Sequence, residues 1–141
     1  MNSIKKKPLR LASLVLTLVI CLCFFTTVAQ ARASDYLLAY GASIVADGYG
    51  KVSVWYDVTG TGKMDEVGST VITIYENGTL VKTFQYTTTP SMMAYNTNFH
   101  GGSVSYYGVS GRSYYSYVTF WAGKQGDGDN RTKQTSTIVA S

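Results

Sequence analysis

Hydrophobic and polar residues alternate along much of the chain after residue 34, with the period of two that is typical of β-strands. The clearest example is the segment 51–58, where Val52, Val54, Tyr56 and Val58 alternate with Lys51, Ser53, Trp55 and Asp57. A strand of this kind buries one face and exposes the other. No stretch after residue 34 carries a hydrophobic stripe with a period of 3.6 residues, so the pattern predicts an all-β domain.

Short runs of β-branched and aromatic residues predict the other strands. We expect strands over residues 36–45, 51–58, 70–75, 80–86, 103–109, 114–122 and 133–140. Asn77-Gly78 favours a type I′ turn, and therefore a hairpin, between two of these strands. About seven strands linked by polar turns are typical of a sandwich of two antiparallel sheets.

The segments between these strands are predicted to be turns and loops. Residues 47–50 and 124–130 are rich in Gly and Asp, as turns are. Residues 59–69 form a glycine-rich connection, in which 64–67 are expected to make one helical turn. Residues 87–102 contain Pro90 and His100 and have no clean period, which predicts a long surface loop.

One face of the segment 114–122 is predicted to be core. The alternation leaves two choices: either Tyr114, Ser116, Val118, Phe120 and Ala122 point inward, or Tyr115, Tyr117, Thr119 and Trp121 do. We assign the first set to the core. A shift of one residue would reverse the choice, because the period of a strand is two.

The first 33 residues follow a different pattern. Lys5, Lys6, Lys7 and Arg10 precede an uncharged apolar run over 11–25, and the small residues Ala29, Ala31 and Ala33 follow it. This is the pattern of a secretory signal peptide, and the run is shorter than the roughly 20 residues of a membrane span. We expect cleavage after Ala33, or alternatively after Ala31. The product is then a single secreted, extracellular domain of residues 34–141 with no further membrane span.

Removal of this leader changes the charge of the protein. The whole chain has 12 basic and 8 acidic residues, and five of the basic ones (Lys5, Lys6, Lys7, Arg10 and Arg32) lie in the leader. Residues 34–141 therefore carry a net charge of 7 − 8 = −1. This balance argues against a nucleic-acid partner. Cys21 and Cys23 also lie in the leader, so the domain has neither a disulfide nor a cysteine metal site.

Residues 111–123 (GRSYYSYVTFWAG) place a turn before a strand, with Tyr114 two residues before the core position Ser116. This order resembles strand F of an immunoglobulin-like or fibronectin type III-like sandwich. The resemblance implies an immunoglobulin-like β-sandwich in which Tyr114 forms a tyrosine corner. Ser116 stands where antibody domains have cysteine, so it excludes a disulfide-pinned immunoglobulin.

Residues 51–78 and 114–140 resemble an uncharacterised family of small secreted proteins of Gram-positive bacteria. The landmarks of the resemblance are Gly60, Gly62, the turn at 64–68 and the segment 120–123. It covers nearly all of residues 34–141. It implies secretion from a bacterium, and it implies no particular catalytic or binding residue.

Aromatic residues are the strongest candidates for a binding surface. All 12 tyrosines and both tryptophans lie after residue 34, more than the inner faces of the strands can bury. The predicted outward ones are Trp55, Tyr75, Tyr107, Tyr115, Tyr117 and Trp121. Exposed rings on a sheet suit a glycan or a protein partner. The alternative is ordinary packing between rings on neighbouring strands.

The candidates for metal binding and catalysis are weaker. Asp127, Asp129 and Asn130 place side-chain oxygens close together, as in a fragment of a calcium loop, although a hairpin turn explains them equally well. His100 is the only histidine, so it cannot form a metal site with a second histidine. We predict no cofactor and no catalytic residue.

These observations favour a non-enzymatic extracellular module that binds a protein or a glycan. One alternative is a small secreted antimicrobial or toxin-like effector, which size and export would also fit. A second is a glycan-acting enzyme, whose paired acids would have to come from Asp57, Asp65, Glu66 or Glu76.

Overall fold

The computed structural model describes residues 34–141. The predicted signal peptide, its cleavage sites at Ala31 and Ala33, and both cysteines lie outside the described residues. The described elements are seven strands and one 3-10 turn: β1 (Leu37–Gly48), β2 (Lys51–Glu76), β3 (Thr79–Gln85), η1 (Pro90–Met92), β4 (Met93–Tyr107), β5 (Ser113–Lys124), β6 (Asp127–Gln134) and β7 (Ile138–Val139). Among these elements no helix is long and apolar enough to cross a membrane.

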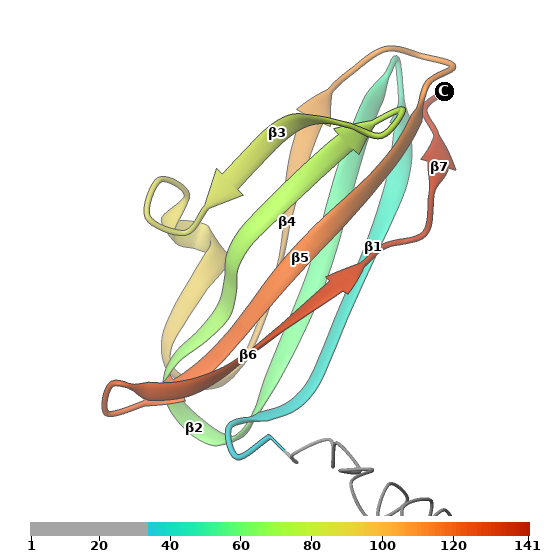
Figure 1. Cartoon of the computed structure of the whole chain (residues 1–141). Helices are drawn as coiled ribbons and strands as arrows, with labels where there is room; N and C mark the ends of the chain where they lie inside the picture. The colour runs from blue at the N-terminus through green and yellow to red at the C-terminus, as the bar shows by residue number, and fades with distance from the viewer. Residues whose placement is uncertain (1–33) are drawn as a thin grey trace, which may run out of the picture. The chain divides into compact units, whose positions relative to one another are not determined.

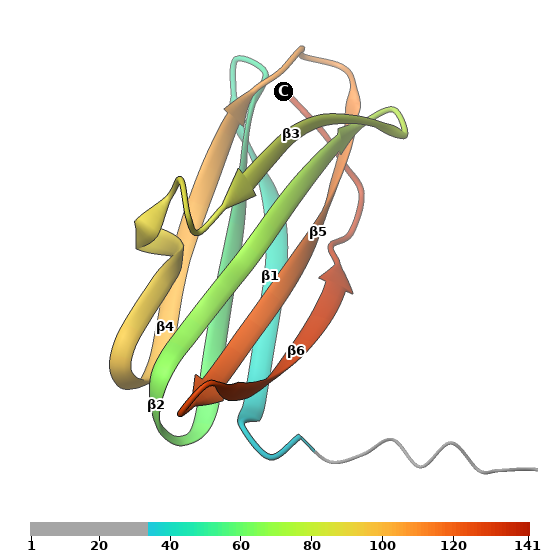
Figure 2. The same cartoon turned by 60° about the vertical axis from the view of Figure 1, so that its left-hand side comes forward.

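The strands are antiparallel and join into one curled sheet, which confirms the all-β prediction. Strand β2 belongs to both halves of this sheet. Its first half pairs with β1 and β4, and its second half pairs with β3 and β5. Figures 1 and 2 show the two halves lying face to face. We call them the β1 layer (β1 with the adjoining parts of β2 and β4) and the β5 layer (β3, β5, β6, β7 and the rest of β2).

A single hydrophobic core fills the space between the layers. The β1 layer contributes Val52, Val54 and Val58, and the β5 layer contributes Ile72, Val118 and Phe120, all with 0% exposure. The predicted inner face of 114–122 is confirmed, because each of its five residues is fully buried. The described residues thus have a hydrophobic core of their own, as a domain that can fold alone requires.

The predicted connection over 59–69 and its helical turn at 64–67 are wrong. Strand β2, which is 26 residues long, continues through this segment and crosses from one layer to the other. Gly60 leaves room for the buried side chain of Met64 at this crossing, since a Cβ at Gly60 would lie 2.6 Å from Cγ of Met64. Pairing with neighbours holds the segment extended where its own glycine-rich composition disfavours a strand.

The predicted loop over 87–102 is also wrong for most of its length. Strand β4 begins at Met93 and follows β2 around the crossing, with Thr97 opposite Met64 and Phe99 opposite Thr59. His100 therefore lies on a strand and is half-buried, whereas a surface loop was expected. The alternating pattern of a strand is hidden here because β4 bends with its partner.

The C-terminal strands differ from the prediction as well. The turn after β5 consists of Gln125 and Gly126, both with positive φ, so the expected turn over 124–130 is too long. Strand β6 begins at Asp127, and the expected strand over 133–140 is divided between β6 and the short β7.

The hairpin between β2 and β3 is confirmed. Glu76 pairs with Thr79, and the two residues between them, Asn77 and Gly78, have φ of 47° and 84°. Positive φ at both positions defines the predicted type I′ turn.

Tyr114 makes the contact expected of a tyrosine corner. Its hydroxyl accepts a hydrogen bond from the amide of Val109 at 2.7 Å, five residues upstream. The same hydroxyl donates to Glu76, which also pairs with Arg112. Burial, followed by the hydrogen bond to Glu76, raises the pKa of Tyr114. Glycine is needed at position 108, because a Cβ there would lie 2.2 Å from this hydroxyl oxygen.

Candidate functional site

The outer face of the β1 layer carries an exposed tryptophan with small residues around it. Trp55 lies on β2 and is 53% exposed. Its partners across the sheet are Ser43 on β1 and Ser103 on β4. Neither serine side chain is large enough to cover the indole, so the ring is accessible from solvent.

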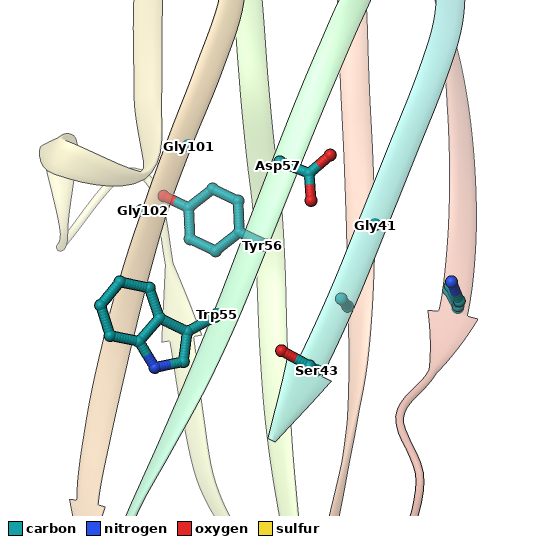
Figure 3. Close-up of a pocket in the computed structure, with 9 residues that line it drawn as sticks. Gly41, Ser43, Trp55, Tyr56, Asp57, Gly101 and Gly102 are labelled. Carbon is teal, nitrogen blue, oxygen red and sulfur yellow. The ribbon is translucent and has the colours of Figure 1, made fainter. Parts of the chain in front are cut away.

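The next outward position on β2 holds a carboxylate between two glycines. Asp57 pairs with Gly41 on β1 and with Gly101 on β4. We call these six residues together the Trp55 platform: Gly41, Ser43, Trp55, Asp57, Gly101 and Ser103. Figure 3 shows the indole leaning over β4 and the carboxylate of Asp57 leaning towards Gly41.

A shallow open depression of about 560 Å³ lies along this face. Backbone and side chains of β1, β2 and β4 line it, together with Lys133 from β6. Glycine at position 41 is part of its geometry, because a Cβ there would lie 2.6 Å from Oδ1 of Asp57. The floor therefore combines an apolar ring, a carboxylate, the hydroxyl of Ser43 and a lysine.

Tyr56 supports this face from within. Its side chain points to the inner side of β2, is only 4% exposed, and occupies the space that a Cβ at Gly102 would need. Its hydroxyl lies 3.3 Å from Nε2 of His100, and the same nitrogen lies 2.8 Å from the carbonyl oxygen of Ser91. Burial raises the pKa of Tyr56 to about 12. These contacts tie β2 and β4 to η1 below the platform.

Three of the predicted outward aromatics meet on the outer face of the β5 layer. Tyr75 and Tyr115 are paired across the strands and stack at 5.0 Å with an angle of 2° between the rings. Tyr117 meets both edge-on, at 5.7 and 5.9 Å. Tyr75 and Tyr115 are half-buried, and Tyr117 is 37% exposed. The rings contact one another, as cross-strand packing does.

The other two predicted aromatics lie apart from these. Tyr107, at the end of β4, is 74% exposed and has the ammonium of Lys51 6.0 Å from its ring centre. Trp121 is half-buried on β5 and lies over Gly123 and Gly128, where added Cβ atoms would come within 2.9 and 2.5 Å of its ring. Its indole Nε1 is buried with no hydrogen-bond partner among the described residues. The structure therefore does not bring the six predicted aromatics together.

The predicted calcium ligands face different ways. Asp127 and Asp129 are two residues apart on β6, so they share a face, whereas Asn130 lies on the opposite one. Oδ2 of Asp129 accepts hydrogen bonds from the hydroxyl of Ser34 at 2.7 Å and the amide of Tyr36 at 3.0 Å. These bonds, the one from Ser34 first, lower the pKa of Asp129.

Acidic residues do not gather into a metal site in this domain. Within residues 34–141, no group of three or more His, Cys, Asp or Glu side chains is placed to hold a metal ion. Of the acids considered for glycosidic chemistry, Asp57 and Glu76 lie on different halves of β2. Asp65 accepts a hydrogen bond from the amide of Gln125, and it lines a small depression of about 180 Å³ together with Glu66.

The sequence indicated Trp55 as an outward ring and Asp57 as a candidate acid, but it did not indicate the other residues of the platform. Ser43 and Ser103 lie 12 residues before and 48 residues after Trp55 in the chain. Only the pairing of β1 and β4 with β2 brings these residues beside the ring. The signal that could have indicated them is the small size of residues at alternate positions in two neighbouring strands.

Comparison with known proteins adds no relative. No protein-family model matches the chain, and neither a curated protein nor a solved structure is significantly similar to it.

Proposed function

We propose that this protein is an extracellular, non-enzymatic module that binds carbohydrate on the Trp55 platform. The observation that carries the proposal is the half-exposed indole of Trp55 between two serines, with a carboxylate in the next outward position. The predicted export leader supports action outside the cell.

The chemistry of the platform suits a sugar ring. One face of a pyranose presents C–H groups, which can lie on a flat aromatic surface. Its hydroxyl groups need hydrogen-bond partners, which Asp57, Ser43 and Ser103 can supply. A shallow, open depression also accommodates part of a long chain, whereas a small metabolite requires an enclosed pocket.

The strand order supports an immunoglobulin-like or fibronectin type III-like classification. One layer has the order β1-β2-β4 and the other β3-β2-β5-β6, and a tyrosine opens β5 with its hydroxyl on the upstream backbone. Such architectures serve many functions, so the binding proposal rests on the platform and not on the fold.

The test is binding of residues 34–141 to arrays of bacterial cell-wall and host glycans. We expect saturable binding that Trp55→Ala weakens about tenfold or more, since loss of a central aromatic contact costs roughly 1.4 kcal/mol or more. With Trp121→Phe as background, Trp55 is the only tryptophan of the domain, so its fluorescence should shift when the ligand binds.

Tyr49→Ala is the matched control. It removes a more exposed ring, 99% accessible, from the turn between β1 and β2, outside the platform. Binding that survives Trp55→Ala, or that Tyr49→Ala removes equally, would contradict the proposal. Absence of binding to any glycan would favour a protein partner or an effector role instead.

A further inference from the structure

Strand β4 has one free side. Within residues 34–141 it pairs with β2 alone, from Gly68↔Met93 to Lys51↔Tyr107. Figure 2 shows β4 on the left-hand side of the molecule, with η1 further to the left. A free strand edge offers unpaired N–H and C=O groups to another strand.

The pairing pattern shows which groups of β4 are free. The amide of Gly108 donates to the carbonyl oxygen of Gly50, so positions 50 and 108 form a hydrogen-bonded pair. In an antiparallel ladder such pairs alternate with pairs that are not hydrogen-bonded. The residues that direct their backbone groups away from β2 are therefore Gly101, Ser103, Ser105 and Tyr107.

This edge lacks the features that protect the other edges. Between Phe99 and Tyr107 the ladder has no register shift, and the strand has no Lys, Arg, Asp, Glu or Pro. By contrast, β3 carries Lys82, and β1 has two register shifts and Asp47. Strand β6 carries four charges: Asp127, Asp129, Arg131 and Lys133. Charges and bulges are the means by which proteins discourage edge pairing, and β4 has neither along this stretch.

We propose that β4 pairs with β4 of a second copy of this chain, so that the protein is an antiparallel, two-fold symmetric dimer. In the register that pairs Ser103 with Ser105 of the second copy, all four residues with free backbone groups form hydrogen bonds across the interface. Each copy's Gly101 then lies opposite Tyr107 of the other. This register exchanges about eight backbone hydrogen bonds, two for each hydrogen-bonded pair.

The side chains along this edge fit a second copy. Tyr107 is 74% exposed, and its ring would gain cover above Gly101, beside the exposed ring of Phe99, whose Cζ lies 3.3 Å from where a Cβ at Gly101 would be. At the centre of the interface serine faces serine, so no like charges are brought together there. Residues 34–141 carry a net charge of only −1, so long-range repulsion between two copies is weak.

The dimer would place both Trp55 platforms on one face of a continuous sheet. Two β4 strands separate the two tryptophan-bearing strands, which is three strand spacings or roughly 14 Å. Any effect of this spacing on glycan binding rests on the proposed function, whereas the dimer itself does not.

The test uses residues 34–141 and the variant Ser105→Pro, with Ser105→Ala as its control. Proline removes an N–H that points away from β2, and it leaves the β2–β4 hydrogen bonds in place. Both variants lose the 2.8 Å contact between the hydroxyls of Ser105 and Ser53, so only the edge N–H and the backbone restriction of proline distinguish them.

We expect light scattering to give the mass of two copies for the wild type and for Ser105→Ala, and of one copy for Ser105→Pro. Hydrogen exchange should show protected amides at positions 101, 103, 105 and 107 in concentrated wild type, and loss of that protection on dilution. This second measurement decides the matter if Ser105→Pro does not fold. A wild type that stays monomeric up to its solubility limit, or a dimer in which these amides exchange freely, overturns the proposal.

Discussion

Tyr114 holds the start of β5 through a single hydroxyl group. That group accepts from the amide of Val109 and donates to Glu76, and the side chain is fully buried. The sequence indicated Tyr114 by its place before Ser116, but it did not indicate Glu76, which is 38 residues away. Spacing along one strand can be read from sequence, whereas a partner on another strand depends on the fold.

We therefore expect Tyr114→Phe to lower the free energy of unfolding by about 1–3 kcal/mol, because it leaves the part-buried amide of Val109 without its acceptor and removes one of the two donors to Glu76. Urea denaturation measures this difference. Tyr115→Phe is the control, since it removes a hydroxyl from the neighbouring, half-buried residue on the outer face. An equal loss in both variants would show that the hydroxyl of Tyr114 has no special role.

At the platform, the contact between Asp57 and Gly41 likewise depends on the fold. The carboxylate occupies the space that a side chain at position 41 would fill, so Asp57 in this position requires glycine at position 41. They are 16 residues apart in the chain. Nothing in the local sequence of either residue indicates the other, because their contact exists only once β1 and β2 are in register.

At the scale of elements, the long strand β2 organises the domain. It reaches from Lys51 to Glu76 and contributes to both layers. The sequence indicated its two ends correctly, because Val52–Val58 and Ile72–Ile74 alternate as strands do. It did not indicate that the glycine-rich middle is also extended, since that segment is held by β4 and β5 rather than by its own residues.

Gly68 is where η1 and the start of β4 come closest to β2. A Cβ at this position would lie 2.2 Å from the carbonyl oxygen of Met92 and 2.9 Å from Cα of Met93. Both atoms belong to the backbone and cannot move aside as a side chain can. We expect Gly68→Ala to destabilise the domain by about 2 kcal/mol or more, as overpacking of a buried contact does.

Gly62→Ala provides the matched control for this prediction. It is another glycine of β2, and nothing lies within 4 Å of the Cβ that would be added there. Its free energy of unfolding should stay within about 0.5 kcal/mol of the wild type in urea titrations. If Gly68→Ala proves as stable as Gly62→Ala, the close approach of η1 to β2 is not present in solution.

At the scale of the whole molecule, carboxylates connect one strand or terminal segment to another. Asp129 binds the first described residues through Ser34, Asp47 accepts from Ser53, and Glu76 accepts from Tyr114. Each of these hydrogen bonds is the main reason that the pKa of its carboxyl group lies below the usual value. Arg112 lowers the pKa of Glu76 further.

Stability should therefore fall in acid. A carboxyl group with a lowered pKa in the folded state stabilises the fold above its unfolded pKa of about 4, and this contribution is lost as the pH falls through the folded value. Urea midpoints measured between neutral and acidic pH should decrease, with a shallower decrease for Asp129→Asn. The same slope in that variant would mean that the bonds to Ser34 and Tyr36 contribute nothing.

The sequence by itself determined the all-β class, the hairpin at Asn77-Gly78, the buried face of β5 and the position of Tyr114. These features depend on residues that lie close together in the chain: an alternating pattern, a turn pair, or a fixed spacing. The predicted leader, whose pattern is equally local, lies outside the described residues.

Only the tertiary structure decided that β2 crosses between the layers, that β4 follows it, and that Ser43 and Ser103 flank Trp55. It also decided that β4 keeps a free, uncharged edge within the described domain. The reason is the same in each case. Pairing between strands joins residues that are far apart in the chain, and their register is set by the packing of the two layers and not by any one segment.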